Sequence, residues 1–211
     1  MSLLDRFKIE FWKFFAFFYR LLLQWRGLKV GKDCFIDGMP IFRRVKGSRV
    51  TLGDQVTLIS IPRHNPLLTH PVTLKTITPH AVLEIKAHAG ISGAKLVCCN
   101  RITVGEYTII GPDTLIYDSE GHHYSPETGW ISRRVRTGNP ITIGSKCFIG
   151  TRCIILSGVT IGDNCVIAAG SVITHDVPSG YKASGNPATL TPLPKVLGGV
   201  GRRPKKTSEK C

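Results

Sequence analysis

Aliphatic residues recur at every sixth position through the C-terminal half of the chain. The repeat runs without a slip through six isoleucines, and a small or β-branched residue stands four positions after each: Ile143, Ile149, Ile155, Ile161, Ile167 and Ile173; Cys147, Cys153, Val159, Cys165, Ser171 and Val177. Neither the period of a helix nor the alternation of an isolated strand produces this register. A period of six is typical of a parallel β-helix, in which short strands stack coil on coil. The pattern therefore predicts an all-β chain of this kind.

The same register continues upstream with interruptions. Shorter sets have the same spacing: Leu52 and Leu58; Ile85, Ile91 and Val97; Val104, Ile110 and Ile116. The 27-residue step from Ile116 to Ile143 is not a multiple of six. We therefore expect an insertion to leave the coil over residues 117–140. Residues 61–79 hold four prolines and predict a second excursion.

The cysteines match the repeat better than they match a disulfide or metal framework. There are seven, an odd number, and none form a Cys-x-x-Cys pair. If three hexads make one coil, Cys147 and Cys165 stack on one another and Cys153 lies on another face. Free cysteine behaves as a small buried hydrophobe, so we expect these residues to fill corners of the coil. This usage indicates a reducing, cytoplasmic compartment.

Residues 1–28 predict an amphipathic N-terminal α-helix. Its polar and apolar positions fall on opposite sides of a helical wheel: Arg6, Glu10, Lys13, Arg20 and Gln24; Phe7, Phe11, Phe14, Phe18, Leu21, Leu22 and Trp25. Charges interrupt the segment too often for it to span a bilayer. Two alternatives remain open. Residues 1–26 lie peripherally on the inner face of the cytoplasmic membrane, or the apolar face packs on the protein's own body.

The formal net charge of +14 indicates polyanionic partners. Anionic lipid and the phosphates of a small molecule such as CoA both fit this charge. No nucleic-acid-binding motif accompanies it, so we expect no nucleic-acid partner. Residues 191–211 are rich in Lys and Arg and predict a flexible basic tail.

Residues 141–188 resemble the hexapeptide-repeat acyltransferases, in particular the galactoside, maltose and polysaccharide O-acetyltransferases. The resemblance lies in four segments: Ile143–Gly150, Gly158–Asn164, Ala169–Thr174 and Gly185–Ala188. Together with the upstream coils it extends over about residues 50–190. It implies a left-handed parallel β-helix over residues 29–190, a homotrimer, and transfer of an acetyl group from acetyl-CoA to a hydroxyl of a sugar or surface-polysaccharide precursor.

The expected catalytic residues lie in the insertion. Asp118, Glu120 and His122 stand in a segment that is similar to the family's loop motif, in which acidic residues and a glycine precede a catalytic histidine. Histidine suits a general base because it titrates near neutrality. Asp118 or Glu120 would orient its ring. His123 is adjacent and remains an alternative base or an acceptor-binding residue.

The resemblance also implies binding residues. The CoA candidates are Thr151, Ala169, Thr174, Lys182 and Lys195. The chain has Thr189 and Leu190 where family members commonly carry Arg or Lys, which leaves the phosphate contacts open. In the insertion, Trp130 and Arg133 either bind a carbohydrate acceptor or belong to a solvated basic run.

Three other functions fit parts of the sequence. An N-acetyltransferase acting on an amino sugar would use the same residues. A zinc enzyme of the carbonic-anhydrase type would need three converging histidines, and no histidine pair has that family's spacing, so no metal is expected. A basic β-helical scaffold without catalytic activity would account for the charge but leaves the His122 motif without a role.

Overall fold

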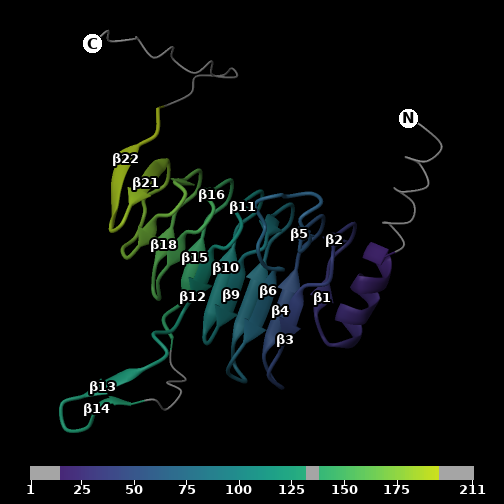
Figure 1. Ribbon diagram of the computed structural model, residues 1–211, viewed down its shortest axis with the longest axis horizontal. Coiled ribbons are helices and arrows are strands. Elements are labelled where there is room, and N and C mark those ends of the chain that lie inside the picture. The colour runs from purple at the N-terminus through teal and green to yellow at the C-terminus, as the bar shows by residue number, and fades with distance from the viewer. Residues whose placement is uncertain (1–14, 132–137, 195–211) are drawn as a thin grey trace.

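A computed structural model describes residues 15–131 and 138–194, and its body is a three-sided coil of parallel strands (Figure 1). The first sheet, in spatial order, contains β1 (Lys29–Val30), β4 (Arg49–Leu52), β7 (Val82–Ile85), β10 (Arg101–Val104), β15 (Ile141–Ile143) and β18 (Thr160–Ile161). The third contains β3 (Ile41–Arg43), β6 (Thr73–Thr76), β9 (Lys95–Cys98), β12 (Leu115–Tyr117), β17 (Ile154–Ile155) and β20 (Val172–Ile173).

The second sheet completes the coil. It contains β2 (Phe35–Asp37), β5 (Thr57–Ile59), β8 (Gly90–Ser92), β11 (Ile109–Ile110), β16 (Phe148–Ile149), β19 (Val166–Ile167), β21 (Tyr181–Gly185) and β22 (Ala188–Pro192). Only β21 and β22 pair antiparallel within it. Successive strands of the coil visit the three sheets in turn, so the predicted parallel β-helix is confirmed.

The isoleucine repeat forms the core. Each repeat isoleucine is buried, and residues 18 apart lie side by side, as in the pairing of Ile149 with Ile167 and of Ile155 with Ile173. The preceding residue points outward, so Thr142 and Phe148 are exposed next to buried Ile143 and Ile149. Alternation within each short strand thus separates the core from the three outer faces.

The cysteines of the repeat are free and buried at the corners. Their thiols donate to carbonyl oxygens of the following coil: Cys147 to Gly162 at 3.0 Å, and Cys153 to Ala168 at 3.2 Å. Burial raises the pKa of Cys147 to about 11, so its thiol remains protonated near neutrality. These residues fill corners of the coil, as the repeat predicts, and they also add hydrogen bonds between coils.

A single described helix, residues 15–25, closes the N-terminal end of the coil (Figure 1). Leu23 is fully buried and Tyr19 packs against the core. Arg26, just after the helix, donates to the carbonyl of Phe42 at 2.7 Å and lies over its ring. None of the helical residues described forms a segment long and apolar enough to cross a membrane.

The large insertion begins after Tyr117, at the end of β12 in the third sheet, and the coil resumes at Ile141, with β15 in the first sheet. Within it, β13 (His123–Ser125) and β14 (Gly129–Ile131) pair antiparallel. This hairpin projects well clear of the coil (Figure 1). Residues 61–71 form a shorter excursion, which buries Leu68 against the coil near Gly93. Both excursions begin after a strand has ended, so they do not interrupt the buried side chains of the repeat.

We expect Ile143→Ala to lower the free energy of unfolding by about 3 kcal/mol, because it leaves a cavity in the continuous core. Chemical denaturation followed by circular dichroism measures this change. Thr142→Ala is the matched control, since the neighbouring side chain faces solvent, and it should change the value by less than about 0.5 kcal/mol. Equal effects of the two substitutions would contradict the assignment of inner and outer positions.

Candidate active site

The base of the insertion is fixed by a buried carboxylate, Asp118. Its two oxygens accept the backbone amides of Cys99 at 2.6 Å and Asn100 at 2.7 Å, one coil earlier in the chain. Its side chain is fully buried. Burial raises the pKa of Asp118, and the hydrogen bonds from the two amides oppose that rise. Asp118 therefore ties the start of the loop to the preceding coil.

The end of the insertion is fastened at the same place. The side-chain amide of Asn100 donates to the carbonyl of Gly138 at 2.7 Å. Gly138 passes so close to the carbonyl oxygen of Asp118 that a Cβ there would overlap it. The hydroxyl of Ser157, one coil later, donates to the same carbonyl at 2.9 Å, and it accepts the amide of Asn139. The two ends of the loop are thus held against each other.

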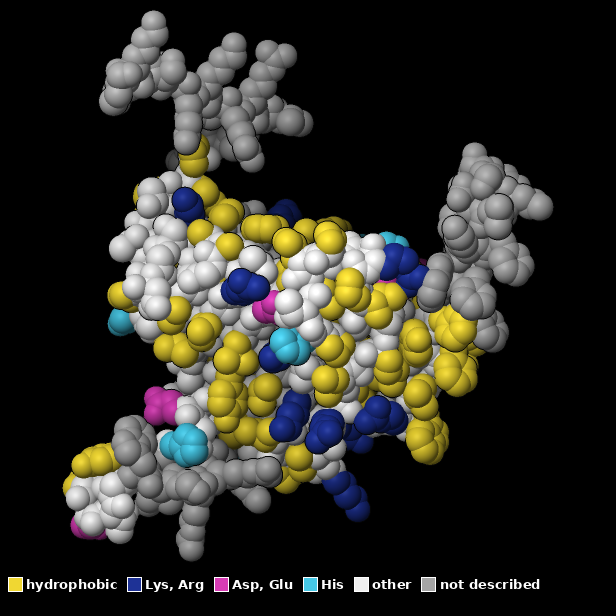
Figure 2. Space-filling model, viewed as in Figure 1, with side chains coloured by type: hydrophobic (Ala, Val, Ile, Leu, Met, Phe, Trp, Pro, Cys, Tyr) yellow, Lys and Arg dark blue, Asp and Glu magenta, His cyan; other side chains and the backbone are white. Residues whose placement is uncertain are grey.

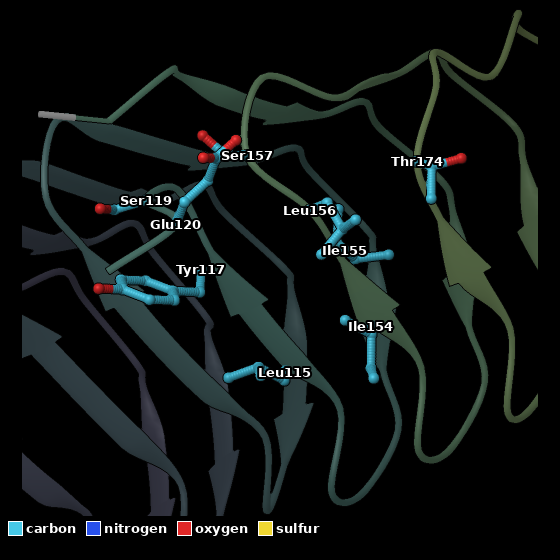
Figure 3. Close-up of a pocket in the computed structure, with 9 residues that line it drawn as sticks. All are labelled: Leu115, Tyr117, Ser119, Glu120, Ile154, Ile155, Leu156, Ser157 and Thr174. Atoms are coloured by element: carbon cyan, nitrogen blue, oxygen red, sulfur yellow. The ribbon is translucent and has the colours of Figure 1, made fainter. Parts of the chain in front are cut away.

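A pocket of about 470 Å³ lies beside this junction, on the outer face of the third sheet (Figure 3). The residues that line it come from β12, the start of the loop, β17 and the positions just after β17 and β20: Leu115, Tyr117, Ser119, Glu120, Ile154, Ile155, Leu156, Ser157 and Thr174. In Figure 3, Leu156 lies between Tyr117 and Thr174. The pocket has an apolar floor, and Glu120 is the carboxylate at its edge.

A second hollow, of about 240 Å³, continues from the pocket toward the C-terminal end of the coil. Its lining includes Thr174, His175, Asp176, Ala188 and Leu190. Thr174 lines both cavities, so they lie next to each other beyond the C-terminal ends of β17 and β20, and together we call them the groove. The hydroxyl of Thr174 lies 2.8 Å from Nδ1 of His175.

The structure places the predicted catalytic residues at different depths. Asp118 is buried under the loop, Glu120 lines the pocket, and His122 is exposed two residues further along. The backbones of His123 and Trp130 lie in β13 and β14, where His123 is opposite Ile131. Arg133 lies outside the described residues. The carboxylate of Asp118 faces backbone amides, so Glu120 is the better placed of the two acids to meet a histidine of the loop.

The predicted CoA residues do not all come together. Thr174 follows β20 and lines the groove. Thr151 and Ala169 precede β17 and β20, at the opposite ends of these strands from Thr174, and the amide of Gly170, next to Ala169, donates to the carbonyl of Thr151. Lys182 lies in β21 on the second sheet. Lys195 lies outside the described residues.

Several residues of the site were not anticipated from the sequence. Asn100, Ser157 and Gly138 shape the loop junction, and Tyr117 and Leu156 form walls of the pocket. Leu156 carried a usable signal, because it stands where the repeat has Gly144, Gly150 and Gly162. Among the residues described, no group of three His, Cys, Asp or Glu side chains is arranged to hold a metal ion.

Comparison with known proteins gives a family match. The family described as "Hexapeptide repeat of succinyl-transferase" matches residues 140–175. YvoF of Bacillus subtilis (strain 168), whose name assigns it to the acetyltransferases, is 33% identical over 138 residues, which cover 63% of this chain and 72% of that protein. The galactoside O-acetyltransferase of Escherichia coli (strain K12) is 38% identical over 91 residues. That alignment covers 42% of each chain, so this chain matches less than half of the enzyme's length.

A solved structure shares the fold over most of the chain. AntD, an N-acyltransferase from Bacillus cereus solved in complex with dTDP and 3-hydroxybutyryl-CoA, superposes with a TM-score of 0.62. The superposition covers 82% of this chain and 87% of AntD at 16% sequence identity. The predicted left-handed form of the parallel β-helix is confirmed.

Replacement of Asp118 tests the loop junction. In Asp118→Asn, an NH2 group replaces one of the two oxygens and faces a buried backbone N–H, so two donors meet without an acceptor. We therefore expect a loss of about 3 kcal/mol in the free energy of unfolding. Asp176→Asn is the control, because the exposed Asp176 accepts a single amide, that of Thr160, and should cost less than about 1 kcal/mol. Denaturant titration compares the two. A stability of Asp118→Asn equal to that of the control would refute the anchoring role.

Proposed function

The chain belongs to the hexapeptide-repeat acyltransferase family, and we propose that it transfers an acetyl group from acetyl-CoA to a hydroxyl of a sugar or polysaccharide precursor. The observation that carries this proposal is the groove made of two adjoining cavities, one beside the base of the His122 loop and the other beyond the end of β20. A long, narrow co-substrate with a reactive end fits a groove with a pocket at one end.

The groove has the chemistry to hold acetyl-CoA. Leu115, Ile154 and Leu156 provide an apolar surface for an acetyl group and the neighbouring pantetheine chain. Further along, the hydroxyl of Thr174 and the backbone near Ala188 offer polar groups. The net charge of +14 favours a co-substrate that carries several phosphates. Thr151, Ala169, Lys182 and Lys195 remain predictions for CoA contacts.

Acetyl-CoA supplies the acetyl group as an activated thioester, so the protein's task is to deprotonate the acceptor and stabilise charge. In our proposal, a ring nitrogen of His122 takes the proton of the acceptor hydroxyl as its oxygen attacks the thioester carbon. The carbon–sulfur bond then breaks, and the proton passes to the departing CoA thiolate. Glu120 at the edge of the pocket would stabilise the protonated ring.

The carbohydrate acceptor would approach from the open side of the loop. His123 and Trp130 in the hairpin, together with Arg133, remain the predicted acceptor-binding residues. A sugar would stack on an aromatic ring and donate hydrogen bonds from its hydroxyl groups. The fastening of both loop ends supports this arrangement, because it holds the start of the loop, with Glu120, at a constant place beside the pocket.

We also propose that the protein is a homotrimer. The outer face of the second sheet carries exposed apolar side chains along its length: Phe35, Ile109 and Phe148. The first sheet instead presents exposed polar residues at its outward positions: Lys29, Arg49, Arg101, Thr142 and Thr160. An apolar face next to a polar face suits a three-fold assembly in which each copy buries its second sheet against a neighbour and leaves the pocket on the third sheet open to acetyl-CoA.

The activity test is acetyl-CoA turnover, followed as free-thiol release, with a panel of sugar acceptors. We expect an acceptor to stimulate release, and we expect His122→Ala to lower kcat by about 10²-fold or more, because the hydroxyl loses its base. His80→Ala is the matched control, since His80 is exposed on the coil away from the pocket and should leave the rate unchanged.

Two results would overturn this assignment. Absence of CoA turnover with every acceptor would remove the acyltransferase proposal. If His122→Ala retains full activity and His123→Ala loses it, the role of general base belongs to His123.

The trimer is tested by light scattering coupled to size exclusion. Wild-type protein should have a mass of about 70 kDa, three times the 23.2 kDa of the chain. Phe148→Glu should reduce it toward 23.2 kDa, because a charge replaces an exposed apolar contact residue without disturbing the core. Thr142→Glu on the polar first sheet is the control and should retain the wild-type mass. A monomeric wild-type protein would contradict the assembly.

A further inference from the structure

The N-terminal helix has two apolar faces, and only one of them is used by the fold. Leu23 and Tyr19 pack against the end of the coil. On the other side, Phe17 is 58%, Phe18 54%, Leu21 47% and Trp25 84% exposed. These four residues, the outer helix face, recur at positions that share one side of a helix. Packing against the coil therefore explains why one side of the helix is apolar. The other side, which is mostly aromatic, is not covered by any of the residues that the structure describes.

Basic residues lie near the C-terminal end of the outer helix face. Residues 15–50 contain eight Lys and Arg and only two acids, Asp33 and Asp37. Asp37 is already paired with Arg63 at 2.9 Å. The exposed bases near the end of the helix include Arg26, Lys29 and Arg44, and the guanidinium of Arg44 lies beside Gly27. Figure 2 shows hydrophobic side chains at this end of the molecule with a group of Lys and Arg side chains on the adjoining surface.

We propose that the outer helix face docks on an anionic lipid surface. Aromatic side chains insert at the boundary between headgroups and acyl chains, and the nearby bases bind the headgroups. Charge decides between this occupant and a second copy of the chain. Two copies meeting through this face would bring their basic residues together, whereas anionic lipid neutralises them.

Docking in this way leaves the candidate active site open. The helix covers the end of the coil next to β1 and β3 (Figure 1). The pocket begins at β12, and β9 and β6 separate β12 from β3 in the third sheet. A lipid surface under the helix therefore does not cover the groove, and the protein can bind membrane and co-substrate together. The proposal stands whether or not the proposed acetyl transfer is correct.

The test is co-sedimentation of the full chain with vesicles. We expect binding to phosphatidylcholine vesicles that contain 30% phosphatidylglycerol, roughly tenfold weaker binding to phosphatidylcholine alone, and weakening by added salt. The variants Trp25→Ser and Phe17→Ser/Leu21→Ser should each lower the partition coefficient by about tenfold or more. Both remove exposed side chains, so the thermal midpoint of unfolding should not change.

The matched control is Leu67→Ser, because Leu67 is 65% exposed but lies on the excursion at residues 61–71. It should bind vesicles as the wild type does. Failure of the wild-type protein to bind anionic vesicles would overturn the proposal. Vesicle binding by both helix variants at the level of the wild type would also overturn it. A reduction in oligomeric mass in those variants, without any vesicle binding by the wild type, would instead assign the outer helix face to a second copy.

Discussion

The rest of the structure depends on the inward ladder of aliphatic side chains at the centre of the coil. Strands of two or three residues, such as β16 and β17, are too short to be stable alone. They persist because each adds one isoleucine to a column shared with the coils before and after it, as Ile149 does between Ile110 and Ile167. The chain is therefore constrained within every hexad, and it is free to leave the coil only where a strand has ended.

That constraint determines where a functional loop can be placed. The insertion after Tyr117 departs from the end of β12, and the coil resumes with β15 as if the loop were absent. The buried carboxylate of Asp118 and the hydroxyl of Ser157 connect the loop to the coils on either side. The rigid ladder thereby becomes the support of the candidate site. The pocket lies between the loop and the same ladder, so its position relative to Glu120 follows from core packing.

The sequence predicts the coil better than it predicts the site. A period of six is a local pattern, and the burial it implies can be read directly from Ile143 to Ile173. The junction of the loop depends on contacts between residues far apart in the chain, such as Asn100 with Gly138 and Ser157 with Asp118. No local period reports such pairs. The same holds for Thr151 and Thr174, which the motif groups together but the coil places at opposite ends of the neighbouring strands β17 and β20.

Two further features could not be derived from the pattern. The helical wheel assigns one apolar face to the N-terminal helix, whereas the structure divides its apolar residues between a packed side with Leu23 and an exposed side with Trp25. A helical wheel ranks positions by polarity and has no information about what covers them.

Corners of the coil also place His88 and Tyr107 in the left-handed backbone region, which is unusual for such side chains. Stacking of their rings, with centroids 4.4 Å apart, accompanies this conformation.

The proposed reaction depends on the binding of acetyl-CoA in the groove beside the His122 loop, and a crystal structure of the protein with acetyl-CoA decides whether it binds there. We expect the thioester to lie in the pocket between Glu120 and Thr174, against Leu156, and the rest of the molecule to follow the groove toward Ala188. Acetyl-CoA bound on another face of the coil, with this pocket empty, would contradict it.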